Sequence, residues 1–337
     1  MTFFLTYYPI TSLLMLRDYL KLHFIVLLWG FTAILGRLLT LPPVELVGWR
    51  TGLAALGLGG LLLARRRPAG AGSPAAAAQL LGTGGLVAAH WITFFLAARL
   101  SSVSICLAGL ATLALWTSLL EPLLLRRPVR AYEIGLGLVS LLGLGLVATT
   151  LVSPAHPAAA PSTQLLGLGV AVLSAGLSAV FSIINSRLVR RHEPLVLTLW
   201  EMGGAFLSVV LFLPVYSRFF TAGTGLHLAL GFNGFAPPWQ WVGDWLWLAL
   251  LAGACTVYAF ATSVELMRRL APFAVNLTIN LEPVYGIVLA VLIFGEKERM
   301  AGGFYLGTGL IVLSVLLHPV VERRMRSREA RAAQPVV

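Results

Sequence analysis

The amino-acid sequence predicts an all-α integral membrane protein with ten transmembrane helices, arranged as two inverted repeats of five. Three observations predict this fold class. The composition is 58% hydrophobic and only 11% charged, whereas a soluble domain has about a quarter of its residues charged. Apolar runs of about 20 residues, the length that a membrane helix needs, follow one another along the chain. A motif of the first half also returns in the second half.

The apolar runs are separated by short segments that contain basic residues, proline or glycine. Because such segments end helices, each run is predicted to be one membrane-spanning helix. The predicted spans are 22–40, 44–64, 77–99, 102–125, 131–152, 164–188, 194–214, 243–266, 271–294 and 301–319.

The repeated motif reads RLLTLPPVELVGWRTG at residues 37–52 and RLVRRHEPLVLTLWEMGG at residues 187–204. Each copy lies between two apolar runs, so each is predicted to be a helix end, a turn with proline and the start of the next helix. Five spans per repeat is an odd number, so the second repeat enters the membrane from the opposite side. Inverted repeats of this kind recur in transporters, with the substrate site near mid-membrane.

Most of the 24 lysine and arginine residues lie in segments on one side of the predicted helices. Basic residues near span ends are retained in the cytoplasm, which predicts a multi-pass protein of the inner (plasma) membrane with both termini cytoplasmic. Residues 1–21 lack the pattern of a removable signal peptide. The predicted organisation is an N-terminal cytoplasmic segment 1–21, a first repeat 22–152, an outer linker 153–163, a second repeat 164–319 and a basic cytoplasmic tail 320–337.

Several other classes of partner are disfavoured. The net charge is +11, but the basic residues form short clusters between apolar runs, which argues against a nucleic-acid partner. Cys106 and Cys255 both lie inside spans, so neither a disulfide nor a cysteine metal site is expected. The chain has no phosphate-binding loop and no His-Glu-x-x-His motif. The expected partners are a small-molecule substrate and the lipid bilayer, without a metal or other cofactor.

A central substrate-binding pocket is predicted from polar and aromatic residues that lie mid-span and share helix faces. Such a lining offers hydrogen bonds and aromatic faces without a strong net charge, so it suits a neutral or zwitterionic organic solute. The alternative for the histidine is that it merely ties its helix to a neighbour. The predicted lining residues are His90, Thr93, Phe94, Trp116, Ser182, Tyr258, Thr262, Asn276 and Asn280.

Two ionisable residues occupy equivalent places in the repeated motif, Arg50 in the first copy and Glu201 in the second. Both lie deep enough in the membrane to need a partner inside the protein. With a rise of 1.5 Å per residue they are separated by roughly 10 Å along the membrane normal, too far for a direct salt bridge. We hypothesise that Arg50 belongs to an outer gate and Glu201 to an inner gate. The alternative is that each pins its own helix to a neighbour in every state.

The order and spacing of several short motifs resemble the drug/metabolite transporter superfamily, EamA domain type, over residues 22–318. The resemblance implies a ten-span carrier, usually an exporter, of amino acids or other small metabolites, without metal, ATP or catalysis. The chain departs from the family where Arg126-Arg127 replace its usual glycine-glutamate after the fourth span. The motifs are Trp29-Gly30 with Arg37 eight residues after the tryptophan, the prolines before Arg50, Leu281-Glu282-Pro283, Phe294-Gly295-Glu296 and the glycine-rich spans that end each half.

Two other functions compete with transport. A membrane-embedded enzyme acting on lipid would need His90 as a base beside a carboxylate, together with a nucleophile or a metal at the same depth. A passive channel would need repeated rings of polar groups, whereas the small polar residues of this chain are spread evenly. The sequence therefore favours a secondary transporter and no enzymatic activity.

Overall fold

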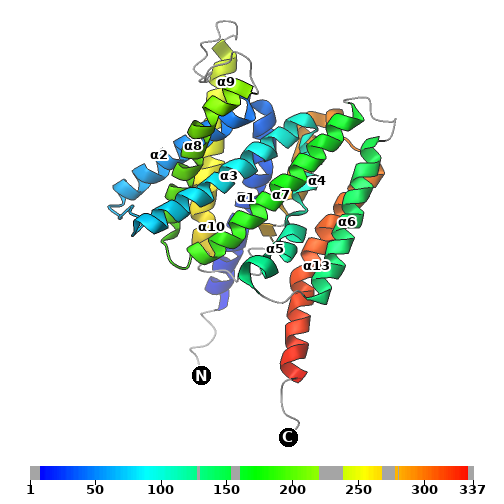
Figure 1. Ribbon diagram of the computed structural model, residues 1–337. Coiled ribbons are helices and arrows are strands. Elements are labelled where there is room, and N and C mark those ends of the chain that lie inside the picture. Colours follow the sequence, from blue (N-terminus) through cyan, green and yellow to red (C-terminus); the bar gives the residue numbers. More distant parts are fainter. Residues whose placement is uncertain are drawn as a thin grey trace.

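The computed structural model describes residues 8–126, 130–152, 160–219, 238–267, 278–279 and 281–332. These residues form helices and turns and contain no strand. Eight helical segments among them are long and apolar enough to cross a membrane, in agreement with the predicted all-α membrane fold. The chain's first helix begins and its last helix ends at the same end of the helical body (Figure 1).

The helices of the first half follow the predicted spans closely. Proline begins α2 and α3, at a position where its missing N–H has no partner to lose. Ser73 caps α3, because its hydroxyl accepts a hydrogen bond from the backbone N–H of Ala76 at 3.1 Å. The helices are α1 (Tyr8–Leu38), α2 (Pro43–Ala64), α3 (Pro74–Leu100), α4 (Val103–Leu110), α5 (Leu113–Leu125) and α6 (Ala131–Val152).

The second half repeats this layout, and two of its helices also begin with proline. Its elements are α7 (Pro161–Leu188), α8 (Pro194–Phe219), α9 (Pro238–Ala249), the π-helix η1 (Leu250–Tyr258), α10 (Ala259–Met267), α12 (Glu282–Phe294), the 3₁₀ turn η2 (Gly295–Lys297) and α13 (Gly302–Ala332). The predicted ninth span, 271–294, is described only at 278–279 and 281–294. In the predicted tenth span the apolar helical segment is shorter, Gly302–Ser314. The number of ten spans and the inverted relation of the repeats therefore stay predictions.

Two predicted spans are not continuous α-helices. The fourth is divided into α4 and α5 at Ala111-Thr112, where the Thr112 hydroxyl donates to the carbonyl of Gly109 at 2.7 Å. The eighth contains η1, in which the hydroxyl of Thr256 donates to the carbonyl of Leu251 at 2.8 Å. A π-helical segment inside an α-helix frequently marks a functional site.

Both terminal helices extend beyond the predicted spans. α1 begins at Tyr8, so residues 8–21 are helical and continuous with the helix of the first predicted span. α13 runs on to Ala332, well past the predicted end of the last span. Both extensions are rich in leucine, methionine, arginine or glutamate, which favour helix.

The two halves pack against each other along most of their length. α3 lies at the centre and crosses α7 and α8, α2 also packs on α8, and α6 and α13 form a pair at one edge (Figure 1). In the α6–α13 pair, a Cβ at Gly143 would lie 2.6 Å from the carbonyl oxygen of Gly307, and a Cβ at Gly307 would lie 2.6 Å from the carbonyl oxygen of Gly143. Only glycine permits this approach of two backbones.

Candidate functional site

Arg50 is buried between three helical elements, with 2% of its surface exposed. Its Nε donates to Oγ1 of Thr256 on η1 at 2.9 Å, and its guanidinium carbon lies 3.7 Å from the ring centroid of Trp91 on α3. Another guanidinium nitrogen, Nη1, is buried and has no hydrogen-bond partner among the described residues. A buried cation normally pairs with an anion, but no ion pair involves Arg50 in the described part of the chain. Arg50 thus joins α2 to α3 and η1.

His90 on α3 is tied to α7 through Ser174. Its Nδ1 lies 2.9 Å from both the carbonyl oxygen and the hydroxyl of Ser174, and that hydroxyl donates to the His90 carbonyl at 2.9 Å. The imidazole also contacts two aromatic rings, Phe94 at 6.2 Å and Phe181 at 5.5 Å between centroids. This polar and aromatic cluster holds α3 and α7 together near mid-helix.

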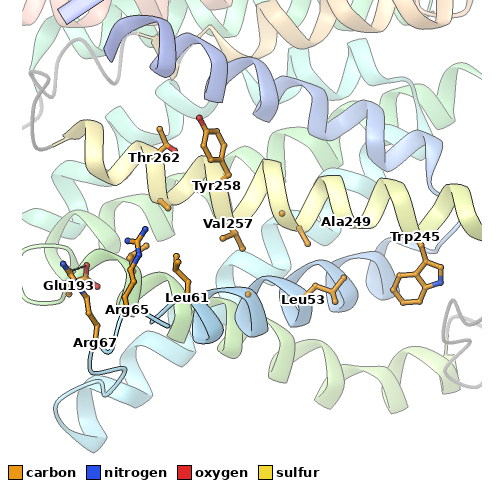
Figure 2. A pocket seen from close by; sticks show the side chains of 15 residues that line it. Leu53, Leu61, Arg65, Arg67, Glu193, Trp245, Ala249, Val257, Tyr258 and Thr262 are labelled. Atoms are coloured by element: carbon orange, nitrogen blue, oxygen red, sulfur yellow. Dashed lines mark ion pairs between the residues drawn. The ribbon is translucent and has the colours of Figure 1, made fainter. Parts of the chain in front are cut away.

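A groove lies between α2 on one side and α9, η1 and α10 on the other (Figure 2). It encloses about 830 Å³, within the range of cavities that hold small ligands. Its walls are mostly small or aliphatic, and Tyr258 and Thr262 supply polar groups from η1 and α10 (Figure 2). The lining is Leu53, Gly57, Leu61, Arg65, Arg67, Glu193, Leu195, Trp245, Ala249, Ala252, Gly253, Val257, Tyr258, Ala261 and Thr262.

The two ends of the groove differ in chemistry. At the end formed by the last turn of α2 and the first residues before α8, Arg67 and Glu193 form an ion pair at 3.6 Å beside Arg65 (Figure 2). At the other end, the groove is lined by the aromatic ring of Trp245 (Figure 2). The centroid of this ring lies 5.4 Å from that of Trp49. The charged end is the one that could admit a polar solute.

The Trp245 end of the molecule is closed by polar contacts between the halves and within the first half. Asp244 on α9 accepts hydrogen bonds from the backbone N–H of Thr40, at 3.0 Å, and from the Thr40 hydroxyl. Arg99, at the end of α3, donates to the carbonyl of Leu39 at 2.7 Å and to that of Leu41. These bonds fix the turn between α1 and α2.

Glu298 adds a second closure at the same end. One carboxylate oxygen accepts from the backbone N–H of Val103 at 3.0 Å, and the other accepts from that of Ser104 at 2.8 Å. The side chain is buried, and a carboxylate at a helix N-terminus is stabilised by the helix dipole. Glu298 therefore fixes the turn after α12 to the first turn of α4.

The contact between α3 and α8, which we call the α3–α8 seam, is closed by glycines. A Cβ at Gly84 would overlap the carbonyl oxygen of Glu201, and a Cβ at Gly204 would lie 2.6 Å from Cα of Leu81. A Cβ at Gly85 would lie 3.0 Å from Oγ of Ser208. Backbone therefore meets backbone along this seam, and no cavity separates the two helices there.

Glu201 lies within the α3–α8 seam with 2% of its surface exposed. The side chain of Asn185 on α7 lies beside this carboxylate. The carboxylate oxygen Oε1 of Glu201 and the amide oxygen Oδ1 of Asn185 are both buried, and neither has a hydrogen-bond partner in the part of the chain that the structure describes. Two acceptor oxygens without donors thus lie in one buried place.

Contacts between α2 and α8 fix the separation of the two ionisable residues. A Cβ at Gly52 would lie 3.0 Å from Phe206, and one at Gly59 would lie 3.9 Å from Leu199. In this antiparallel pairing, Arg50 on α2 lies beside the part of α8 that is about seven residues after Glu201. At the helical rise per residue, this places the two residues about 10 Å apart along the helices. The two side chains form no ion pair with each other.

The predicted pocket residues are distributed over several places. His90 and Phe94 share the cluster with Ser174, whereas Tyr258 and Thr262 line the groove. The hydroxyl of Thr93 donates to carbonyls of its own helix, those of Ala89 at 2.8 Å and His90 at 2.9 Å.

Trp116 and Ser182 lie elsewhere. Trp116 packs on α7, where a Cβ at Gly176 would be 3.4 Å from the indole, and its Nε1 is buried without a partner. Ser182 is exposed on α7. Asn276 and Asn280 lie outside the described residues.

The profile of the EamA-like transporter family matches residues 19–149 and 165–318, one match in each half. The chain belongs to this family. A solved crystal structure has the same fold, with a TM-score of 0.58 over 92% of this chain and 98% of the other, at 19% identity. No curated protein sequence matches the chain significantly.

As an EamA-like transporter, the protein is a multi-pass membrane protein of a family that moves small molecules and is not a family of enzymes. This confirms the resemblance that the motifs indicated. Among the described residues, no group of three or more histidine, cysteine, aspartate or glutamate side chains could hold a metal ion.

Sequence reasoning did not assign three contact residues of this EamA-like transporter, Ser174, Thr256 and Glu298, to the site. Ser174 belongs to a ladder of serines on α7, a weak signal for a polar helix face. Thr256 follows the small residues Gly253 and Ala254 with no distinguishing pattern. Glu298 lies in a turn rich in charged residues, where a carboxylate is ordinarily solvated.

Proposed function

We propose that the protein is a secondary transporter that exports small metabolites across the bacterial inner membrane by alternating access. In this proposal the two matched repeats are inverted relative to each other, each with five spans. The observation that carries the proposal is an asymmetry between the repeats. The groove along α2 is open, whereas the α3–α8 seam is closed by glycine backbones. In an inverted arrangement these two contacts are equivalent, so the protein would alternate between opening one and opening the other.

The distribution of charge assigns the sides. The charged end of the groove carries Arg65 and Arg67, and basic residues near span ends favour the cytoplasm. The closed end, with Asp244 and Glu298, then faces outward. Both termini are cytoplasmic in this assignment, because α1 begins and α13 ends at the groove's charged end (Figure 1).

For the substrate, we retain a neutral or zwitterionic organic solute. The groove offers about 830 Å³ with mostly apolar walls and a few polar groups, as small-molecule sites do. The proposed substrate-binding residues remain those predicted from the sequence, with the cluster of His90, Phe94 and Ser174 between α3 and α7 and with Tyr258 and Thr262 in the groove.

For gating, we propose that Arg50 and Glu201 act at different contacts. The hydrogen bond from Arg50 to Thr256 joins α2 to η1 toward the closed, outward end of the groove, before the first α2 residue of the lining, Leu53, so it holds that end closed. Glu201 lies in the α3–α8 seam and controls the other separation. Arg50→Gln should favour the outward-open state, and Glu201→Gln the inward-open state.

The test is transport by the purified protein in sealed vesicles, with candidate metabolites and with protein-free vesicles as the control. If no candidate accumulates or leaves faster than in protein-free vesicles, secondary transport is the wrong activity. His90→Ala and Ser174→Ala should each slow transport of an identified substrate. If both leave it unchanged at normal expression, this cluster is not part of the pathway.

The proposed orientation has a separate test. Ser73 and Ser162 are both exposed, at the first turns of α3 and α7. In a variant without Cys106 and Cys255, a cysteine at position 162 should react from outside intact cells with a thiol reagent that cannot cross the membrane, and one at position 73 should not. Equal reaction at both positions would contradict the assigned sides.

A further inference from the structure

Glu201 presents an unusual chemical situation for a membrane interior. Its carboxylate is 2% exposed, and no lysine, arginine or histidine of the described residues forms an ion pair with it. Moving an unpaired carboxylate out of water is costly, and such groups inside membranes typically mark ion or proton pathways. Among the described residues, no donor meets the carboxylate oxygen Oε1.

Among the described residues, Asn185 is the polar side chain that lies beside this carboxylate, and its amide oxygen also has no donor there. An amide group can donate through its nitrogen to an ionised carboxylate. It can also accept, through its oxygen, from a protonated carboxylic acid. The Asn185 side chain can therefore satisfy either protonation state of Glu201 by turning about its terminal bond.

The other charged and titratable groups described on the elements around α8 either bond to other residues or lie far from Glu201. His90 on α3 is bound to Ser174, Arg50 on α2 is bound to Thr256, and Arg187 on α7 donates to a backbone carbonyl of α5 at 3.1 Å. Glu45 lies in the first turn of α2, at the end far from Glu201 in the antiparallel α2–α8 pair. The side chain of Glu265 on α10 lies outside the described residues.

We propose that Glu201 and Asn185 form a proton-binding site whose occupancy is coupled to closure of the α3–α8 seam. The inference rests on the proposed function, because it names the coupling ion of an alternating-access carrier. One carboxylate oxygen and one amide oxygen are too few for a metal cation, which takes six or more oxygen ligands when hard and divalent. A single proton, taken up from water and returned to it, needs one oxygen to bind and one to accept its hydrogen bond.

Closure of the seam and protonation favour each other for a physical reason. When the seam is closed, Gly84 lies on the backbone of Glu201 and water is excluded from the carboxylate. The neutral acid tolerates this burial, whereas the ionised form requires hydration. Opening the seam hydrates Glu201 and releases the proton. By linkage, acid on the side to which the seam opens must favour the closed seam.

The experiment reports seam opening without any substrate. Ser208 faces Gly85 across the seam, so Ser208→Cys, in full-length protein lacking Cys106 and Cys255 and reconstituted in vesicles, reacts with a thiol reagent when the seam opens. The rate is measured in mildly acidic and mildly alkaline buffer and divided by the rate of the unfolded protein, which removes the pH dependence of the thiol itself. We expect the corrected rate to rise by about tenfold with alkaline pH, a typical size for coupling between two sites.

Variants locate the proton. Glu201→Gln should give a slow, pH-independent rate, because it mimics the protonated acid. It should also lose one protonated-carboxyl band from the infrared difference spectrum between the two buffers. Asn185→Ala should keep the titration but move its midpoint, as expected for a positioning residue. Glu296→Gln, at a side chain that is 80% exposed, is the matched control and should behave like the parent.

The outcomes are separable. A pH-dependent rate that persists in Glu201→Gln, or an unchanged infrared band, would overturn the assignment to Glu201. If Glu201→Gln fails to fold, Glu201→Asp keeps the acid and should still titrate, with a shifted midpoint, and a loss of titration there would also count against the proposal. Failure of solute transport in vesicles bears on the proposed function alone, because neither the labelling rate nor the infrared signal requires a substrate.

Discussion

The α3–α8 seam and the groove along α2 are both contacts between one half of the molecule and the other, yet they have opposite packing. In the seam, a Cβ at Gly84 would overlap backbone of α8. In the groove, a Cβ at Gly253 would meet nothing within 4 Å. Glycine thus permits close approach of two backbones in the seam, whereas in the groove it leaves space between the helices. The role of a glycine in a membrane helix therefore depends on the helix that it faces.

The ionisable residues sharpen this contrast. Glu201 is enclosed by the closed seam, and its carboxylate has no cationic partner among the described residues. Arg50 lies three residues before Leu53 of the groove wall and reaches across to Thr256. We interpret the present arrangement as one of two states, in which the closed seam holds the acid and the open groove is bounded by the cation.

The largest expected effect comes from locking the seam. Gly85→Cys with Ser208→Cys, in protein without Cys106 and Cys255, places two thiols where a Cβ and a hydroxyl are now 3.0 Å apart. Oxidation should abolish transport, because the second state cannot form, and a reductant should restore it. Each single cysteine variant is the control. Full transport by the oxidised, cross-linked protein would show that the seam does not open.

Introducing a side chain into the seam should have the next largest effect. Gly84→Leu must separate α3 from α8, and overpacking of this kind typically costs about 1–3 kcal/mol of folding stability. At Gly82 on α3 or Gly253 in the groove, a Cβ meets no described atom within 4 Å, so the same change there should leave thermal unfolding in detergent nearly unchanged. Equal destabilisation by all three would remove the distinction between the two contacts.

Sequence reasoning located the helices well but not their contacts. Apolar length and turn residues predicted α2, α3 and α6 to within three residues at each end, because membrane insertion depends on local composition. The division at Ala111-Thr112 and the π-helix η1 were not predicted, since both depend on hydrogen bonds that tertiary packing selects. The sequence does not predict the terminal extensions of α1 and α13, because charged and polar residues indicate the end of a membrane span and not the end of a helix.

The candidate site was predictable in kind and not in detail. Depth in the membrane indicated that Arg50 and Glu201 need partners inside the protein, but nothing local indicates that these are Thr256, Trp91 and Asn185. Residues that share a helix face were grouped into one pocket, whereas the structure distributes them over a cluster, a groove and an exposed surface. Which face of a helix meets a cavity is set by its neighbours.

Removing the closure at the outer end should have a moderate effect. Glu298→Ala leaves the N–H groups of Val103 and Ser104 without their acceptor. A buried donor without an acceptor lowers folding stability by about 1–3 kcal/mol. We expect a lower unfolding temperature and greater outward opening in thiol labelling. Glu296→Ala, at an exposed side chain nearby, is the control. An unfolding temperature like that of the parent would mean that the two hydrogen bonds of Glu298 do not hold this closure.

The smallest expected effect concerns the bond that bounds the groove. Thr256→Val removes the acceptor of the Arg50 Nε hydrogen bond but keeps the contact with Trp91, so it should cost about 1 kcal/mol. Arg50→Gln loses both and should cost more, with a shift toward the outward-open state in labelling. A larger loss for Thr256→Val than for Arg50→Gln would contradict the part assigned to Arg50.

The groove and the α3–α8 seam are proposed to open alternately, and two distances measured in the same protein test this alternation. Spin labels at positions 53 and 249 span the groove, and labels at positions 82 and 207 span the seam. In membranes, pulsed electron resonance on the parent and on Gly84→Leu should give a shorter groove distance and a longer seam distance in the variant. A groove distance that does not change while the seam widens would contradict the account, because the two contacts would then move independently.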